Sequence, residues 1–191
     1  MAVILEAPSV RREVEFLAAV RRSRRLHGSW ALSPSTPEAF KHLLRRAREK
    51  NRASFFVCLK TGELVGVINV SEIVMGSLRS AYLGYYGFTP YSRKGYMRAG
   101  LTLVLDHAFR KLRLHRLEAN IQPANEPSRA LVRSLGFLLE GFSPRYLNSG
   151  GRWKDHERWA ITAEDWKAKK AKKAKKCDAR ADARTVRSRR Q

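Results

Sequence analysis

Cysteine, acidic residues and long apolar runs are all scarce in this chain of 191 residues. Its two cysteines are Cys58 and Cys177, and the second lies in a highly charged segment, so we expect a reduced, cytosolic protein without a disulfide framework. No apolar run approaches the roughly 20 residues that cross a bilayer. Met1–Ser9 also lacks the apolar stretch of a secretory signal. We therefore expect no membrane association.

The shortage of acidic residues leaves a net charge of +22, from 39 Lys and Arg against 17 Asp and Glu. Residues 167–191 concentrate 12 of the basic residues and only two acidic ones, and residues 1–166 keep a net charge of +12. Such a field attracts nucleic acid, a ribosome surface or a multiply phosphorylated cofactor, and charge alone does not choose among them. The Lys-Ala-Lys-Lys repetition of residues 167–191 predicts a disordered basic tail.

Hydrophobic residues make up 43% of the chain, enough for one domain with an ordinary core over residues 1–166. Apolar spacing predicts a helix over residues 9–26, and Thr36 is expected to cap a second helix. Later helices are expected around residues 101–112 and after Asn125. The expected strands are 3–5, 54–59, 64–73, 81–88, 114–121, 137–147 and 152–161. This order predicts an α/β fold with a mixed, mostly antiparallel sheet flanked by helices.

The most informative segment is a basic glycine turn, Ser92-Arg93-Lys94-Gly95-Tyr96-Met97, between an aromatic strand and an amphipathic helix. Unpaired backbone N–H groups and the positive end of the helix dipole face outward at such a helix start. That geometry receives phosphate. The turn and its helix are followed by a strand and then by a helix that begins at Asn125. This arrangement suggests a nucleotide-like cofactor held in a groove, and hence an enzyme.

Six ordered blocks carry a family resemblance. They are Tyr82-Leu83-Gly84-Tyr85, Gly95-Tyr96-Met97, Pro123–Ser128, Leu135-Gly136-Phe137, Trp153-Lys154-Asp155-His156 and Thr162–Trp166. Together with the flanking elements they resemble the GNAT superfamily of acetyl-CoA-dependent N-acetyltransferases, and within it the ribosomal-protein-alanine N-acetyltransferase (RimJ/RimL-like) branch. The resemblance covers about Val3 to Trp166. It implies a GNAT-like sheet and acetyl-CoA as the cofactor.

The resemblance implies a cofactor site whose loop departs from the family pattern. Ser92 stands where Arg or Gln is usual, and Arg93 where Gly is frequent, but backbone N–H groups still suit phosphates and Arg93 adds an ionic contact. The glycines of Gly84–Phe88 imply a bulged strand that splays to admit the pantetheine arm; the alternative is an ordinary bulge packed by tyrosines. The expected cofactor-binding residues are Phe88, Ser92, Arg93, Lys94, Gly95, Tyr96, Met97 and Asn125.

The implied chemistry is direct attack of a neutral amine on the thioester. Many family members place a Tyr acid where Val132 stands here, whereas the RimL-like branch uses a Ser that corresponds to Ser128. Ser128 is therefore expected to act as the acid, and its alternative role is a hydrogen bond to the helix backbone. An α-amine has a pKa of about 7.7–8.0, so a carboxylate acting through water suffices as base. Glu72 is expected to be that base, with a surface strand position as the alternative.

Aromatic residues are expected to line the acceptor side. Residues 26–30 join the first two helices, a segment that lines the acceptor groove in this superfamily. The expected substrate residues are Trp30, Tyr85 and Trp153. His156 is expected to be a structural strand residue bonded to Asp155. No His, Cys or Asp cluster has metal-ligand spacing, so no metal is expected.

Three functions remain open at this point. The first is acetylation of a protein N-terminal amine, such as that of a ribosomal protein beginning with Ala, Ser or Thr. The second is acetylation of a small amine, and the basic body disfavours a polyamine there because like charges repel. The third is a non-catalytic module that associates with a ribosome or RNA. The tail either docks on rRNA or only aids solubility, and the sequence leaves monomer and dimer open.

Overall fold

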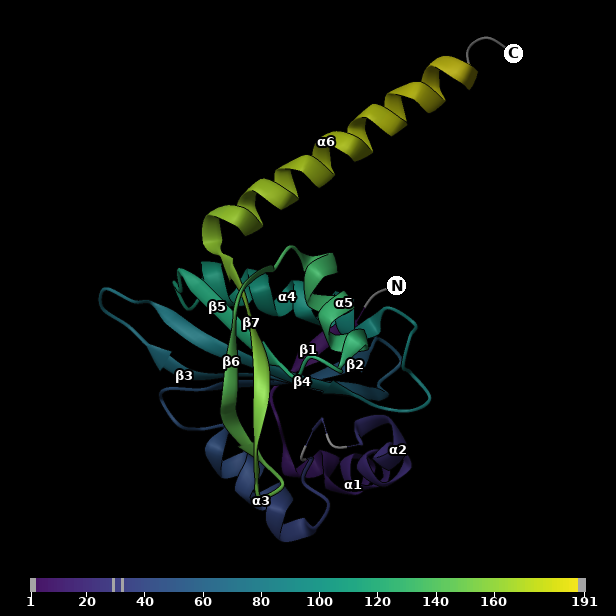
Figure 1. The fold of residues 1–191 in the computed structure, drawn as a ribbon. Helices are drawn as coiled ribbons and strands as arrows, with labels where there is room; N and C mark the ends of the chain where they lie inside the picture. The colour runs from purple at the N-terminus through teal and green to yellow at the C-terminus, as the bar shows by residue number, and fades with distance from the viewer. Residues whose placement is uncertain (1–2, 29, 32, 189–191) are drawn as a thin grey trace.

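The chain folds around a seven-stranded sheet with the strand order β1-β2-β3-β4-β5-β7-β6 (Figure 1). A computed structural model describes residues 3–28, 30–31 and 33–188. Only β4 and β5 pair in parallel, so the sheet is mixed and mostly antiparallel, which confirms the predicted fold class. The strands are β1 (Val3–Glu6), β2 (Ala53–Leu59), β3 (Leu64–Val74), β4 (Ser80–Gly87), β5 (Arg116–Ile121), β6 (Leu138–Ser149) and β7 (Arg152–Thr162).

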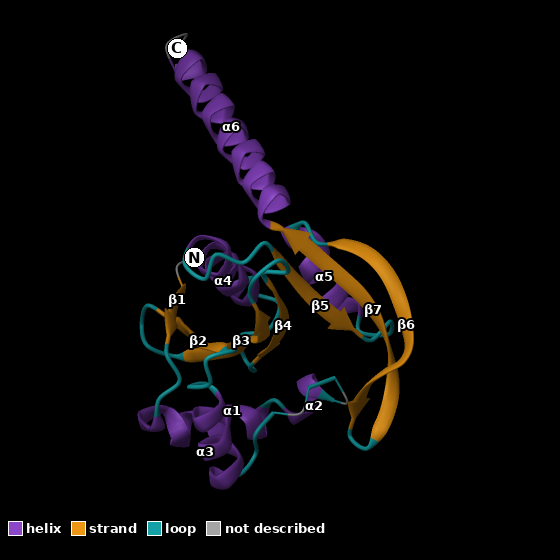
Figure 2. Cartoon of the chain, turned by 90° about the vertical axis from the view of Figure 1, so that its left-hand side faces the viewer, coloured by secondary structure: helices purple, strands orange, loops and turns teal. Residues whose placement is uncertain are grey.

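Helices cover both faces of the sheet, with α1–α3 on one side and α4 and α5 on the other (Figures 1 and 2). The first predicted helix is interrupted at Ser23, whose hydroxyl donates to the Ala19 carbonyl at 2.7 Å and accepts the Thr89 N–H at 2.9 Å. Thr36 caps α3 as predicted, by accepting the Ala39 N–H. The helices are η1 (Val10–Arg12), α1 (Glu13–Arg22), α2 (Arg24–His27), α3 (Pro37–Arg46), α4 (Tyr96–Arg110), α5 (Glu126–Leu135) and α6 (Ala163–Ser188).

Each face of the sheet buries its own apolar core. On one face, Leu101 and Leu105 of α4 share a core with Leu83 of β4. Under α1 and α3, aromatic rings dominate, with Phe16 stacked 5.6 Å from Phe56. Successive side chains of a strand point to opposite faces of the sheet, so alternate residues of β4 belong to different cores.

The end of β4 separates from β5. The two strands pair only from Ser80 to Tyr82, so the predicted splay of this strand is confirmed. The predicted bulge at Gly84–Phe88 is wrong, because the pairing of β4 with β3 runs without a shift from Tyr82 to Gly87. Gly66 and Gly87 serve close packing instead: a Cβ on Gly66 would clash with the Met97 sulfur. The opening beside β4 therefore comes from β5 turning away.

The chain continues past β7 as α6, which leaves the body of the molecule (Figures 1 and 2). Its first turns are anchored, since the Trp166 indole and the Lys170 ammonium both donate to Asp106 at 2.8 Å. Ala and Lys are good helix formers, which explains a helix where the sequence predicted an irregular tail from residue 167. The mobility of the projecting part stays a prediction. No helix in the described part of the chain is long and apolar enough to cross a membrane.

Candidate active site

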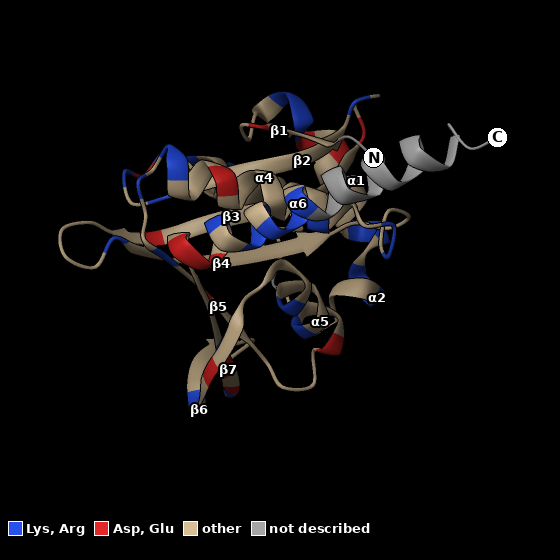
Figure 3. Cartoon of the chain, turned by 90° about the horizontal axis from the view of Figure 1, so that it is seen from above, with Lys and Arg blue, Asp and Glu red and all other residues tan. Residues whose placement is uncertain are grey.

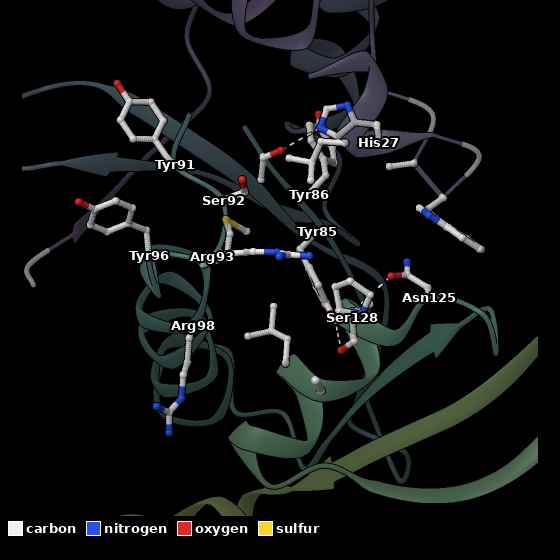
Figure 4. Close-up of a pocket in the computed structure, with 18 of the residues that line it drawn as sticks. His27, Tyr85, Tyr86, Tyr91, Ser92, Arg93, Tyr96, Arg98, Asn125 and Ser128 are labelled. Atoms are coloured by element: carbon white, nitrogen blue, oxygen red, sulfur yellow. Dashed lines mark hydrogen bonds between the residues drawn. The ribbon is translucent and has the colours of Figure 1, made fainter. Parts of the chain in front are cut away.

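A cavity of about 740 Å³ opens where β4 leaves β5 (Figure 4). Its walls come from α2, the end of β4, the loop before α4 and the start of α5. Segments far apart in the sequence therefore meet at one place. The predicted site residues that line it are Trp30, Tyr85, Ser92, Arg93, Gly95, Tyr96, Met97, Asn125 and Ser128.

The loop before α4 forms an open anion cradle. Arg93 (φ 60°) and Gly95 (φ 79°) have left-handed backbones, which turn the chain into the helix. Gly95 caps α4 without a side chain, and the first helical hydrogen bond runs from the Ala99 N–H to its carbonyl. The N–H groups before Ala99 thus have no partner within the helix. With the guanidinium groups of Arg93 and Arg98 on the lining, this helix start is suited to phosphate.

Ser128 and Tyr85 form a hydroxyl pair on the opposite wall. Asn125 caps α5 and accepts the Ser128 N–H at 3.3 Å. The Ser128 hydroxyl then lies 2.7 Å from that of Tyr85. Burial raises the pKa of Tyr85 to about 12, against the opposing effect of the Ser128 hydrogen bond. Tyr85 therefore stays protonated, and the pair is a proton-donating group aimed into the cavity.

Tyr85, which was expected to contact the acceptor, lines the cavity beside α5. The alternation of β4 accounts for this position: Ala81 and Leu83 lie in the core under α4, and Tyr85 follows them on the same face. The period-2 pattern was readable in the sequence, but which face bears α5 was not.

The free edge of β4 supplies backbone donors. The Phe88 N–H bonds the Val65 carbonyl at 2.8 Å. Since successive N–H groups of a strand point to opposite edges, those of Tyr85 and Gly87 point toward the gap left by β5. Phe88 was expected to bind cofactor, but its ring is fully buried in the aromatic core and its N–H is used in the sheet.

His27 of α2 hydrogen-bonds the end of β4 from the face of the sheet that α1–α3 cover. Its Nε2 donates to the Gly87 carbonyl at 2.8 Å, which requires the hydrogen on Nε2. Its Nδ1 lies 3.0 Å from the Ser33 hydroxyl, which then donates to it in the neutral ring. The sequence placed residues 26–30 near the acceptor without singling out His27. The sequence does not show which carbonyl group a histidine at a helix end will bond.

Three further expected residues do not line the cavity. Glu72 lies on the outer part of β3, exposed and ion-paired with Arg52 at 2.7 Å, so the structure does not bring this expected base to the site. Trp153 is 63% exposed near the tip of the β6–β7 hairpin. Lys94 points to solvent beside the cradle. Glu72 and Trp153 stand on strands whose direction is set by strand pairing, which spacing along the chain does not reveal.

His156 is buried, but its bond differs from the expected one. Its Nδ1 bonds the Lys154 carbonyl at 2.9 Å, whereas Asp155 accepts the Arg145 N–H at 2.7 Å. The described residues contain no group of three or more His, Cys, Asp or Glu side chains arranged to hold a metal ion. Burial raises the pKa of the Cys58 thiol to about 12, so this cysteine is not a ready nucleophile.

Known proteins share both the sequence pattern and the fold. Residues 3–138 match the family described as acetyltransferase (GNAT) domain. The ribosomal protein uS5-alanine N-acetyltransferase of Escherichia coli (strain K12) is 39% identical over 104 residues, which are 54% of this chain and 54% of that protein. The chain thus spans about half the length of this curated relative.

Solved structures match over more of the chain. Mycobacterium smegmatis RimJ in complex with CoA-disulfide superimposes with a TM-score of 0.77 at 32% identity, over 85% of this chain and 82% of that one. Spermidine N-acetyltransferase from Vibrio cholerae, in complex with CoA and spermine, gives a TM-score of 0.73 at 20% identity, over 86% and 97%. The second likeness shows the fold alone.

Proposed function

Because the chain belongs to the acetyltransferase (GNAT) domain family, we propose that it transfers an acetyl group from acetyl-CoA to the N-terminal α-amine of a protein, and specifically of a ribosomal protein. One observation carries this proposal. The anion cradle before α4 and the Ser128–Tyr85 hydroxyl pair line the same cavity, so one cavity offers both a phosphate site and a proton donor for a phosphate-bearing thioester.

The residues of the groove fit the parts of acetyl-CoA, which supplies an activated acetyl thioester when bound. The cradle and Arg93 would hold its phosphates. The N–H groups of Tyr85 and Gly87 would polarise the thioester carbonyl, as in an oxyanion hole. The hydroxyl of Ser128, supported by Tyr85, would stabilise negative charge on the departing sulfur.

The charge of the cavity favours an α-amine over a polyamine. Among the described residues that line it, the only carboxylate is that of Glu126, and Arg129 pairs with it. A polycation therefore finds no free carboxylate there. A neutral α-amine, with a free-solution pKa of about 7.7–8.0, needs none. A small neutral amine is the alternative acceptor.

We also propose that α6 brings the protein to RNA. From residue 171 to 188 the helix carries seven Lys and Arg against two Asp, and Figure 3 shows basic residues along its first turns. A helix of 26 residues is about 39 Å long. Without an apolar stripe it suits a phosphate backbone better than a bilayer surface.

The test is acetyl transfer measured with purified full-length protein. Peptides with the N-terminal sequence of ribosomal protein uS5, beginning with Ala or Ser, are offered beside the same peptides blocked at the α-amine and beside spermidine. Thiol release and mass spectrometry of the peptide report the reaction. We expect acetylation of the free α-amine only. Turnover with spermidine alone, or with the blocked peptide through a lysine, would overturn the proposed acceptor.

A further inference from the structure

Two polar side-chain atoms of the described residues are wholly buried without a hydrogen-bond partner. They are the hydroxyl of Tyr86 and the Oδ1 of Asn120. Buried polar groups are nearly always paired, since an unpaired one loses its hydrogen bonds to water without replacement. Two such atoms in one small domain therefore indicate that a bound ligand supplies the missing hydrogen bonds.

Both atoms lie at the same edge and on the same face of the sheet. Tyr86 is the second-last residue of β4, and Asn120 is the second-last residue of β5. The strands are parallel, so both residues lie near the carboxyl ends of their strands, and Tyr86 lines the cavity there. Their neighbours Tyr85 and Ala119 belong to the face under α4, so alternation places Tyr86 and Asn120 on the opposite face. Tyr86 also lines a second cavity of about 540 Å³ beneath α3.

His156 joins them from β7. The pairing of β5 with β7 ends at Ile121 and Glu157, so His156 lies just past the end of β5. Glu157 bonds Arg129 of α5 at 2.8 Å, which places it on the α5 side. His156 accordingly faces the other side, with Tyr86 and Asn120. The strands β4, β5 and β7 thus place three polar side chains on one face of the sheet, near the point where β4 and β5 separate.

A bridging tyrosine confirms this placement. The ring of Tyr146, on β6, lies 6.3 Å from that of His156. Its hydroxyl is 3.3 Å from that of Tyr82, which alternates on β4 with the buried Leu83. His156 and Tyr82 therefore share the face away from α4.

The imidazole of His156 is held as a hydrogen-bond acceptor. The ring is 5% exposed, and its Nδ1–H donates to the Lys154 carbonyl, which can only accept. In the neutral ring the lone pair is then on Nε2. This atom has no hydrogen-bond partner among the described residues and is not one of the two wholly buried atoms. A ring fixed through one nitrogen, with the lone pair of the other left unpaired, is the form that a general base takes.

The carboxylates nearby are already paired or hydrogen-bonded. On β5, Glu118 bonds Arg116 at 2.7 Å, and Arg116 also pairs with Glu140 of β6. Asp155 accepts the backbone N–H of Arg145. Arg158, which pairs in register with Asn120, adds a positive charge on the same face as His156. A positive charge without a free carboxylate beside it suits a neutral amine better than a cationic one.

We propose that His156 Nε2 takes the proton of the attacking acceptor amine, and that Asn120 Oδ1 and Tyr86 Oη hydrogen-bond the N-terminal residues of that peptide. This inference rests on the proposed function and adds to it a general base and a binding site for the acceptor peptide. In this arrangement the thioester would be approached from both faces of the sheet, by Ser128 and Tyr85 on the α5 side and by His156 on the opposite side.

The step balances as follows. The amine nitrogen forms a bond to the acetyl carbon, and one of its protons passes to Nε2. The carbon–sulfur bond breaks and its electron pair stays on sulfur, where the Ser128 hydroxyl donates a hydrogen bond. The imidazolium then releases its proton to water, which leaves the neutral ring for the next turnover.

The test compares His156→Asn with the full-length wild type on an N-terminal Ala peptide. Asn places an amide nitrogen near the position of Nδ1, so it keeps the bond to the Lys154 carbonyl and lacks the Nε2 lone pair. We expect kcat to fall about 100-fold or more, with the Kd for acetyl-CoA unchanged within twofold. In His156→Ala, added imidazoles should restore turnover, and the restored rate should rise with the basicity of the imidazole.

His107→Asn is the matched control, because His107 is a half-buried histidine of α4 that packs on Phe55 away from the cavity. Near-wild-type kcat in folded His156→Asn and His156→Gln would overturn the assignment of the base. Equal losses in kcat and acetyl-CoA binding would also overturn it, since they mark a structural role. A wild type that acetylates no acceptor would instead refute the proposed function, and this inference with it.

Discussion

Tyr85 Oη lies 2.7 Å from Ser128 Oγ, and this contact joins the free edge of β4 to the first turn of α5. The two residues are 43 positions apart in the chain. The pair places a hydroxyl donor against the position that a departing sulfur would occupy, and it couples that donor to a tyrosine that stays protonated.

Ser128→Ala and Tyr85→Phe test this pair. Each substitution should lower kcat, by about tenfold or more for Ser128→Ala, because a donor to the leaving group is lost. The Kd for acetyl-CoA should change little, since the cradle is untouched. The double variant should lose less than the product of the single losses, because the hydroxyls act as a unit. Steady-state kinetics beside calorimetric titration measure both. Multiplicative losses would mean that the hydroxyls act separately.

The raised pKa of Tyr85 predicts alkaline sensitivity. Its folded-state pKa of about 12 exceeds the ordinary value of 10, so the folded state holds the phenolic proton more tightly. This contribution to stability is present below pH 10 and is lost as the pH rises from 10 toward 12. Urea unfolding at several pH values should show stability falling over this window, and less steeply in Tyr85→Phe. Parallel curves would contradict it.

Tyr86→Phe should separate stability from function. Removing an unpaired buried hydroxyl relieves its desolvation cost, so the free energy of unfolding should rise by about 1 kcal/mol. The KM for the acceptor peptide should rise at the same time, with the Kd for acetyl-CoA unchanged. Chemical denaturation and peptide-dependent kinetics give the two readings. A less stable variant would mean that the hydroxyl has a partner in the folded protein.

Gly95→Glu should abolish cofactor binding through charge rather than packing. A Cβ at Gly95 meets nothing within 4 Å, although the φ of 79° strains any side chain. Gly95→Ala is the matched control and should cost about 1–2 kcal/mol of stability with modest loss of affinity. Gly95→Glu adds a carboxylate where phosphates bind and should weaken acetyl-CoA at least tenfold more than Gly95→Ala. Equal effects in calorimetry would show that strain alone matters.

Truncation after Lys170 should test the role of α6. It keeps the anchors to Asp106 and removes residues 171–191. Binding to an rRNA duplex should weaken, and its dependence on salt should become shallower, because fewer phosphates are neutralised. Peptide acetylation should persist. A variant with Lys172, Lys173 and Lys175 replaced by Arg should bind as the wild type, and replacement by Gln should not. Unchanged RNA binding on truncation would refute the docking role.

Features that depend on neighbours in the sequence were predictable. Thr36 before Pro37 and Asn125 before α5 are capping signals within one helical turn, and both cap as expected. Gly95 marks the start of α4 because only a glycine takes its left-handed backbone without strain. The family blocks then implied a GNAT-like, mostly antiparallel sheet packed by these helices.

Features that depend on strand register were not predictable. Phe88 and Gly87 are adjacent, yet one N–H bonds β3 and the other points to the gap, and only the register separates them. Glu72 was the expected base because it carries a carboxylate near the end of a strand, but that strand carries it to Arg52. His156 was expected to bond Asp155, and the sequence did not show that its Nδ1 bonds the Lys154 carbonyl instead.

The amino-acid sequence already determines the family, the helix caps, the glycine loop and the excess of basic charge, since each is written in residues close together in the chain. The tertiary structure alone decided that Ser128 meets Tyr85, that β5 turns away from β4, and that Tyr86, Asn120 and His156 share one face. Those relations follow from long-range pairing in the sheet, where a shift of one residue moves every side chain to the opposite face.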